Sequence, residues 1–108
     1  PAILKGWFDR VLAFGFAYVD GARFETGFFP DKRGLIAVTT GGTPARFSET
    51  GVYGRIEGVL SPVQKSVFGY LGMKTLPPFV AYAAPRVEAA DRARYLDDWR
   101  ERVRQALG

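Results

Sequence analysis

Residues 35–42 read Leu35-Ile36-Ala37-Val38-Thr39-Thr40-Gly41-Gly42, a continuous apolar and β-branched run that ends in a pair of glycines. The run shows no alternation of apolar and polar residues, so it predicts a strand buried on both faces, as in a parallel sheet. A second run, Phe79-Val80-Ala81-Tyr82, follows Leu76-Pro77-Pro78, and the prolines confine strand pairing to residues after 78. Two strands of this kind predict a parallel sheet.

The segment before the first strand predicts a helix followed by a long loop. Residues 3–12 place their apolar side chains at the i, i+3, i+4 spacing of a helix, with Lys5 and Asp9 free to pair on the other face. This spacing predicts that Trp7 is a core residue. Residues 13–33 are rich in glycine and aromatic side chains and predict a loop, which leads into a turn over residues 31–34.

Two further helices are predicted beyond the first strand. Ser61-Pro62-Val63-Gln64 has the pattern of a capping box, which predicts a helix from there to about Leu71, ended by Gly72. Residues 87–107 predict a final helix. Its apolar side is expected to carry Leu96, Trp99, Val103 and Leu107.

The resulting order is helix, strand, helix, strand, helix, which is the alternation of an α/β fold with a right-handed crossover. Two parallel strands alone should not form a stable domain, because parallel sheets need several strands and cover on both faces. We therefore expect residues 1–108 to be the C-terminal part of a single doubly wound domain whose other strands lie upstream. The chain would supply the last two strands and three helices.

The composition excludes several classes of function. The 108 residues include no Cys and no His, which excludes a disulfide framework, a thiol nucleophile, a Ser-His-Asp triad and a His-ligated metal. No acidic spacing predicts a metal site, and no apolar run has the length of a membrane span. The chain also lacks the start of a secretory signal, so a cytoplasmic location is expected.

The charge balance is mildly basic, with 15 basic and 11 acidic residues and a net charge of +4. One interpretation is attraction to a phosphate, dinucleotide or nucleic acid. The densest basic stretch, residues 86–104, is interleaved with acidic residues, which favours an ordinary solvated helix face. Nucleic acid is therefore not an expected partner.

The end of the first strand is the place where a ligand is expected, because open α/β sheets bind ligands at the carboxyl ends of their strands. Thr39-Thr40-Gly41-Gly42 offers hydroxyl groups and a backbone that a flat ligand can approach closely. An ordinary strand-ending turn is the other interpretation. An aromatic set is suited either to a wall around a planar substrate or to core packing: Phe16, Tyr18, Phe47, Tyr53, Tyr70 and Tyr82.

Three blocks of sequence carry a family resemblance: residues 1–11 (Pro-Ala-Ile-Leu-Lys-Gly-Trp-Phe-Asp-Arg-Val), Phe16-Ala17-Tyr18 and residues 38–42. With Leu76-Pro77-Pro78-Phe79 and the last helix, they resemble the NAD(P)H dehydrogenase (quinone) family. Those proteins are flavodoxin-like quinone reductases and include potassium-efflux ancillary oxidoreductases. The resemblance covers nearly the whole chain but only the second half of the family's domain.

The resemblance implies a flavin-dependent, two-electron oxidoreductase. NAD(P)H would pass a hydride to the flavin, and a quinone would then take it in a ping-pong cycle. The cofactor would be FAD, or FMN, and the resemblance assigns cofactor contacts to Thr39, Thr40, Gly41, Gly42, Phe47 and Arg92. The residues matching Tyr18 and Tyr70 border the quinone pocket, and Phe16 is a further expected substrate contact. The family's site is shared across a homodimer.

The sequence departs from the family at two positions where well-studied animal enzymes use a Tyr and a His to stabilise the reduced flavin. Here these positions are Phe47 and Tyr53. Phe47 cannot donate a hydrogen bond, so Tyr53 is the expected catalytic residue, with backbone amides or another group as alternatives. These changes also support a second hypothesis, in which the chain belongs to a non-catalytic or regulatory flavodoxin-like subunit.

Overall fold

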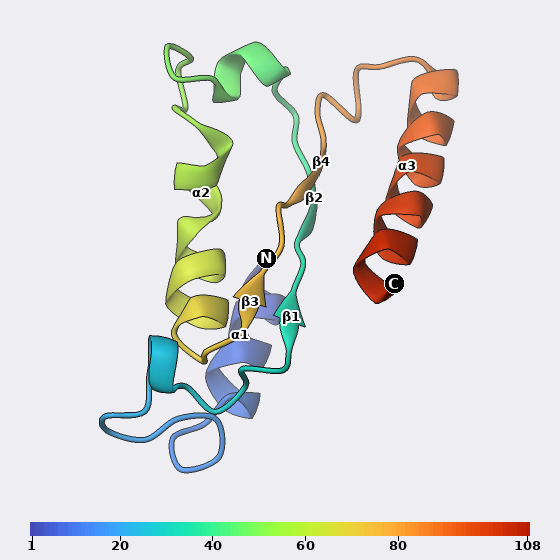
Figure 1. Cartoon of the computed structure of the whole chain (residues 1–108). Coiled ribbons are helices and arrows are strands. Elements are labelled where there is room, and N and C mark those ends of the chain that lie inside the picture. The colour runs from blue at the N-terminus through green and yellow to red at the C-terminus, as the bar shows by residue number, and fades with distance from the viewer. The chain divides into compact units, whose positions relative to one another are not determined.

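The structure, a computed structural model, describes all residues 1–108 and divides them into two compact units. The first unit comprises residues 1–34 and 61–75, and the second comprises residues 35–60 and 76–108. Each unit contains one pair of parallel strands, and the two units are described separately below (Figure 1).

The first unit contains α1 (Ala2–Val11), β1 (Arg33–Gly34) and β3 (Lys74–Thr75), with the short helices η1 (Phe24–Thr26) and η3 (Gln64–Gly69). The strands β1 and β3 are parallel, with Arg33 opposite Lys74 and Gly34 opposite Thr75. Helix α1 packs on η3 through Phe8 and Phe68, whose ring centroids are 6.4 Å apart. The predicted pair of Lys5 and Asp9 is confirmed at 2.7 Å.

The second unit contains β2 (Ala37–Thr39), β4 (Phe79–Ala81), the short helix η2 (Pro44–Phe47) and α3 (Ala89–Leu107). The strands β2 and β4 pair in parallel, which confirms the predicted parallel arrangement. Helix α3 lies alongside β4 (Figure 1), and the rings of Trp99 and Phe79 are 5.5 Å apart. Tyr95 adds a hydrogen bond from its hydroxyl to the Tyr82 carbonyl at 2.7 Å.

The prediction that the first strand is buried on both faces is wrong. Ala37 and Thr39 are exposed and Val38 is half-buried. The faces of a parallel sheet are covered by helices, and here α3 packs against β4, the neighbour of β2.

The strand boundaries also need correction at two places. The predicted turn over residues 31–34 is wrong in its second half, since Arg33 and Gly34 form β1 and the turn lies at Pro30 and Asp31. The prolines were predicted to confine strand pairing to residues after 78. Lys74–Thr75, which lies before them, nevertheless forms the strand β3. The prolines therefore separate β3 from β4 without preventing pairing on their N-terminal side.

The middle helix begins five residues before its predicted start. Helix α2 (Ile56–Val63) carries Pro62 in its interior, so Ser61 does not cap it. The apolar residues Ile56, Val59, Leu60 and Val63 already have the i, i+3, i+4, i+7 spacing that indicates this helix. Pro62 has no N–H to donate, and the helix widens into the π-helical η3 directly after it. The helical segment ends at Gly69, two residues before the predicted end, and Gly72 has φ +86° in the turn that follows.

The faces of the first and last helices differ from prediction. Helix α1 has no buried residue, and Trp7 is 52% exposed, so the prediction of a core position is wrong. In α3, Leu96 and Leu107 are exposed, while Tyr95, Trp99, Val103 and Ala106 form the half-buried side. These four residues also follow a helical spacing, and the stripe they form is displaced by one position from the predicted one at each end, to Tyr95 and Ala106. None of the helices is long and apolar enough to pass through a membrane.

Candidate functional site

The loops that follow β2 and β4 are joined by backbone hydrogen bonds. The amide of Ala83 donates to the Gly42 carbonyl at 2.9 Å, and the amide of Ala84 donates to the Thr40 carbonyl at 3.0 Å. The Thr40 hydroxyl donates to the same Gly42 carbonyl at 2.8 Å. Ala83 holds a left-handed conformation with φ +51°, which is uncommon for a residue with a side chain. The loop of Gly41 and Gly42 is thus held in a defined shape at the carboxyl end of the strand pair.

The helix η2 and the segment after it place an aromatic pair beside this loop. The ring of Phe47 lies 5.0 Å from that of Tyr53, and the amide of Tyr53 donates to the Arg46 carbonyl at 3.0 Å. Gly51 permits this return of the chain, because a Cβ there would lie 2.4 Å from the Ala45 carbonyl oxygen. The two rings are therefore fixed relative to each other.

Together these elements line a cavity of about 310 Å³. Its lining consists of Gly41, Gly42, Arg46, Phe47, Tyr53 and Arg86. A Cβ on Gly41 would meet no atom within 4 Å, so the backbone there faces open space that a flat ring can occupy. The size and aromatic lining fit one planar heteroaromatic ring such as the ring of a flavin.

The structure gathers four of the seven residues predicted for the flavin end of the site in this cavity, namely Gly41, Gly42, Phe47 and Tyr53. Thr39 is exposed in β2, and the Thr40 hydroxyl is directed to the loop backbone. Arg92 lies in α3 and donates from Nη1 to the carbonyls of Val87 and Ala84. Thr39, Thr40 and Arg92 are not part of the cavity lining, and their roles toward a cofactor stay predictions.

Arg92 has a structural role that can be measured. We expect Arg92→Ala to lower the free energy of unfolding by about 1 kcal/mol, because the turn before α3 loses hydrogen bonds from a charged group at an exposed site. FMN affinity should not change, since Arg92 does not line the cavity. Urea unfolding of Arg92→Ala measures the change in stability, and an FMN titration of the same variant measures its affinity for FMN. Arg94→Ala, in the same helix, is the matched control.

Tyr82 packs next to the pair formed by Phe47 and Tyr53, with its ring centroid 5.8 Å from that of Phe47. Burial, and then the negative charge of Glu57, raise the pKa of Tyr82 above its ordinary value of 10.0. The folded state thus favours the neutral phenol. Its contribution to stability is present below pH 10.0 and is lost as the pH rises through the raised pKa.

The effect of Glu57 on the pKa of Tyr82 can be tested by titration at alkaline pH. We expect Glu57→Gln to lower the pKa of Tyr82 only part of the way to its ordinary value, because burial is the larger cause. The measurement is the tyrosinate absorbance during an alkaline titration, with Tyr82→Phe used to identify the step that belongs to this residue. An unchanged step in Glu57→Gln would contradict the coupling.

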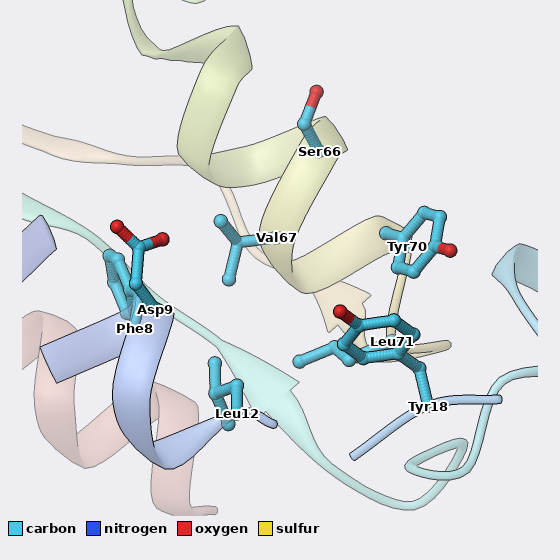
Figure 2. A pocket seen from close by; sticks show the side chains of 8 residues that line it. All are labelled: Phe8, Asp9, Leu12, Tyr18, Ser66, Val67, Tyr70 and Leu71. Atoms are coloured by element: carbon cyan, nitrogen blue, oxygen red, sulfur yellow. The ribbon is translucent and has the colours of Figure 1, made fainter. Parts of the chain in front are cut away.

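The predicted substrate residues lie in the first unit. Tyr18 and Tyr70 pack edge to face with ring centroids 5.5 Å apart, and both line a hollow of about 260 Å³ (Figure 2). Phe8 and Asp9 of α1, Leu12 directly after this helix, and Val67 of η3 also line it. Phe16 does not: it is 66% exposed, and its ring is 6.4 Å from Phe29. Tyr18 and Tyr70 therefore line the same hollow, and Phe16 lies outside it.

Two residues of the cavity in the second unit, Arg46 and Arg86, are not among the site residues predicted from the sequence. Arg86 was counted with the solvated basic stretch of the last helix, but it precedes α3 and donates from Nη1 to the Gly41 carbonyl at 2.7 Å. Arg46 lies directly before Phe47 in η2. For Arg46 the available signal was its position next to the predicted Phe47, whereas no local pattern marked Arg86.

Residues 1–103 match the protein family described as having a flavodoxin-like fold. The chain belongs to this flavodoxin-like family. Its parallel strands and helices agree with the α/β class predicted from the sequence. The match covers both units, including the loop at Gly41 and Gly42 and the hollow at Tyr18 and Tyr70.

Individual relatives of this flavodoxin-like chain are quinone dehydrogenases. It is 37% identical over 103 residues to NAD(P)H dehydrogenase [quinone] 1 of Rattus norvegicus, covering 95% of this chain and 38% of the relative. It is also 37% identical over 103 residues to ribosyldihydronicotinamide dehydrogenase [quinone] of Homo sapiens, covering 95% and 45%. The chain therefore spans less than half the length of these relatives.

A solved structure shows the same fold. The chain superposes with a TM-score of 0.86 on a Klebsiella pneumoniae protein proposed to be a quinone reductase, at 32% identity over 98% of this chain and 44% of that one. General stress protein 14 of Treponema denticola, solved in complex with FMN, gives a TM-score of 0.76 at 27% identity, covering 100% of this chain and 59% of that chain.

Proposed function

We propose that the protein is a flavin-dependent NAD(P)H:quinone oxidoreductase that transfers two electrons. The observation that carries the proposal is the cavity at the carboxyl end of β2 and β4, which is lined by the open backbone of Gly41 and by the rings of Phe47 and Tyr53. Its position is where doubly wound folds bind cofactors. Relatives of this chain are named as quinone dehydrogenases, and one structural neighbour holds FMN.

Four of the six cavity residues have a defined task in this proposal. Gly41 and Gly42 admit the flavin ring, whether of FAD or FMN, against bare backbone. Phe47 packs against it, and the Tyr53 hydroxyl donates a hydrogen bond to its edge. Arg92 would serve the distal part of FAD, which FMN lacks. When bound, the flavin supplies the hydride transfer from NAD(P)H to the acceptor.

The hollow at Tyr18 and Tyr70 is the proposed quinone contact. Its aromatic walls suit a planar ring, and the Asp9 carboxylate and Ser66 hydroxyl give it polar groups. In a homodimer, Tyr18 and Tyr70 of one copy would border the flavin of the second copy. We place the activity in the cytoplasm.

The test is a visible absorption titration of the protein with FAD and FMN, followed by turnover with NADPH and a soluble quinone. We expect a shifted, saturable flavin band and a rate above that of free flavin. Saturable binding without such a rate would favour the regulatory subunit over the enzyme. The absence of any band shift would remove the flavin proposal itself.

A further inference from the structure

Two arginines line the cavity at Gly41 without a carboxylate to neutralise them. The lining contains Arg46 and Arg86 and no Asp or Glu. The five ion pairs of the chain use other cations, namely Lys5, Arg55, Arg94, Arg100 and Arg104. The cavity therefore has a positive charge that nothing in its wall offsets.

Both arginines are also placed by contacts with the loop itself. Arg86 uses Nη1 to bind the Gly41 carbonyl, and a guanidinium has five N–H groups, so donors remain for a second partner. Arg46 lies beside Gly42, since its Cδ would be 3.4 Å from a Cβ built there. The rings of Phe47 and Tyr53 stand next to the same glycine, at 3.1 and 3.5 Å from that Cβ position.

We propose that this cavity selects a planar ring that carries a negative charge, and that Arg46 and Arg86 pair with that charge. Aromatic rings and bare backbone would hold the plane of the ligand, while guanidinium groups favour delocalised anions over neutral rings. The proposal rests on the proposed function only for the identity of the ring. That ring is either the flavin after reduction, which is negatively charged at neutral pH, or a separate aromatic acid.

The flavin arm uses riboflavin, because it has no phosphate and its charge resides on the ring alone. Its dissociation constant is measured anaerobically in the oxidised and the reduced form. We expect the reduced form to bind about tenfold more tightly, the effect of one hydrogen bond to a charged group. The midpoint potential of the bound ring would then rise by about 30 mV relative to free riboflavin.

The acid arm uses two probes of similar size, 2-naphthalenesulfonate and the neutral 2-naphthol. If a separate acid is the ligand, the sulfonate should bind about tenfold more tightly than the naphthol. This preference should shrink at high salt, because both arginines are exposed to solvent.

Variants assign the preference to the two arginines. Arg46→Gln and Arg86→Gln should each lower the preference for the anion about threefold, and the double variant should remove it. The amide at position 86 keeps a donor for the Gly41 carbonyl. Arg100→Gln, on α3 and outside the cavity, has the same change in net charge and should leave the preference intact.

The outcomes separate this inference from the proposed function. A preference for reduced riboflavin identifies the flavin as the anion, and a preference for the sulfonate alone identifies a separate acid. Flavin binding without either preference would keep the proposed function and overturn the inference. Equal or absent binding of all probes in both arms, or a preference that survives the double variant, would also overturn it.

Discussion

Gly27→Ala is expected to lower the free energy of unfolding of the first unit by about 3 kcal/mol. A Cβ at this position would lie 2.4 Å from the backbone carbon of Leu71 and 2.5 Å from the Gly72 nitrogen. Backbone atoms cannot rotate away as a flexible side chain can. The segment would have to separate from the end of η3.

The contact at Gly27 is held by hydrogen bonds on both sides. The amide of Phe24 donates to the Tyr70 carbonyl at 2.9 Å, and the amide of Phe29 donates to the Leu71 carbonyl at 3.0 Å. Separation of the segments would break both bonds. Hydrogen exchange of these two amides, together with urea unfolding, measures the local and the overall effect.

Gly6→Ala is the matched control, because it makes the same substitution in α1, where a Cβ meets no atom within 4 Å. A helix gains about 0.5–1 kcal/mol when an interior glycine becomes alanine. The same chemical change should therefore have opposite signs at the two positions. Equal stability of Gly27→Ala and the wild type would contradict the close approach at η3.

The close approach of Gly27 to Leu71 joins residues far apart in the chain, and local sequence patterns do not show such contacts. Local apolar patterns predicted four elements: helical spacing predicted α1 and α3, and continuous apolar runs predicted β2 and β4. The start of α2 at Ile56 was missed because the capping pattern at Ser61 outweighed the apolar spacing before it. The strand β3 is a two-residue segment, Lys74–Thr75, whose pairing depends on a distant partner and leaves no local pattern.

In the candidate site, too, local sequence patterns predicted some residues and missed those that depend on distant contacts. The loop of Gly41 and Gly42 follows a buried-type run, so its position at the end of a strand was predictable. Phe47 and Tyr53 belonged to the aromatic set found in the sequence, the family resemblance assigned them to the flavin, and the structure places their rings side by side. Arg86 is 45 residues from the Gly41 carbonyl that it binds, and no local pattern in the sequence indicates such a contact.

Gly41→Val should lower flavin affinity at least about tenfold while leaving the fold intact. The Cβ of the added side chain would meet no protein atom within 4 Å, so we expect it to displace a ligand rather than the wall of the cavity. Gly42→Val should also lose affinity, but for a second reason. Its Cβ would lie 3.1 Å from Phe47 Cε2, so the aromatic pair must move as well.

The two variants together distinguish contact with the ligand from disturbance of the wall. Gly58→Val, at an exposed position of α2 where a Cβ meets nothing within 4 Å, controls for the substitution itself. Flavin titrations and urea unfolding are measured on all three variants. If Gly41→Val binds flavin as the wild type does, the ring does not lie on this loop. If only Gly42→Val then lost flavin affinity, the cause would be displacement of the rings of Phe47 and Tyr53.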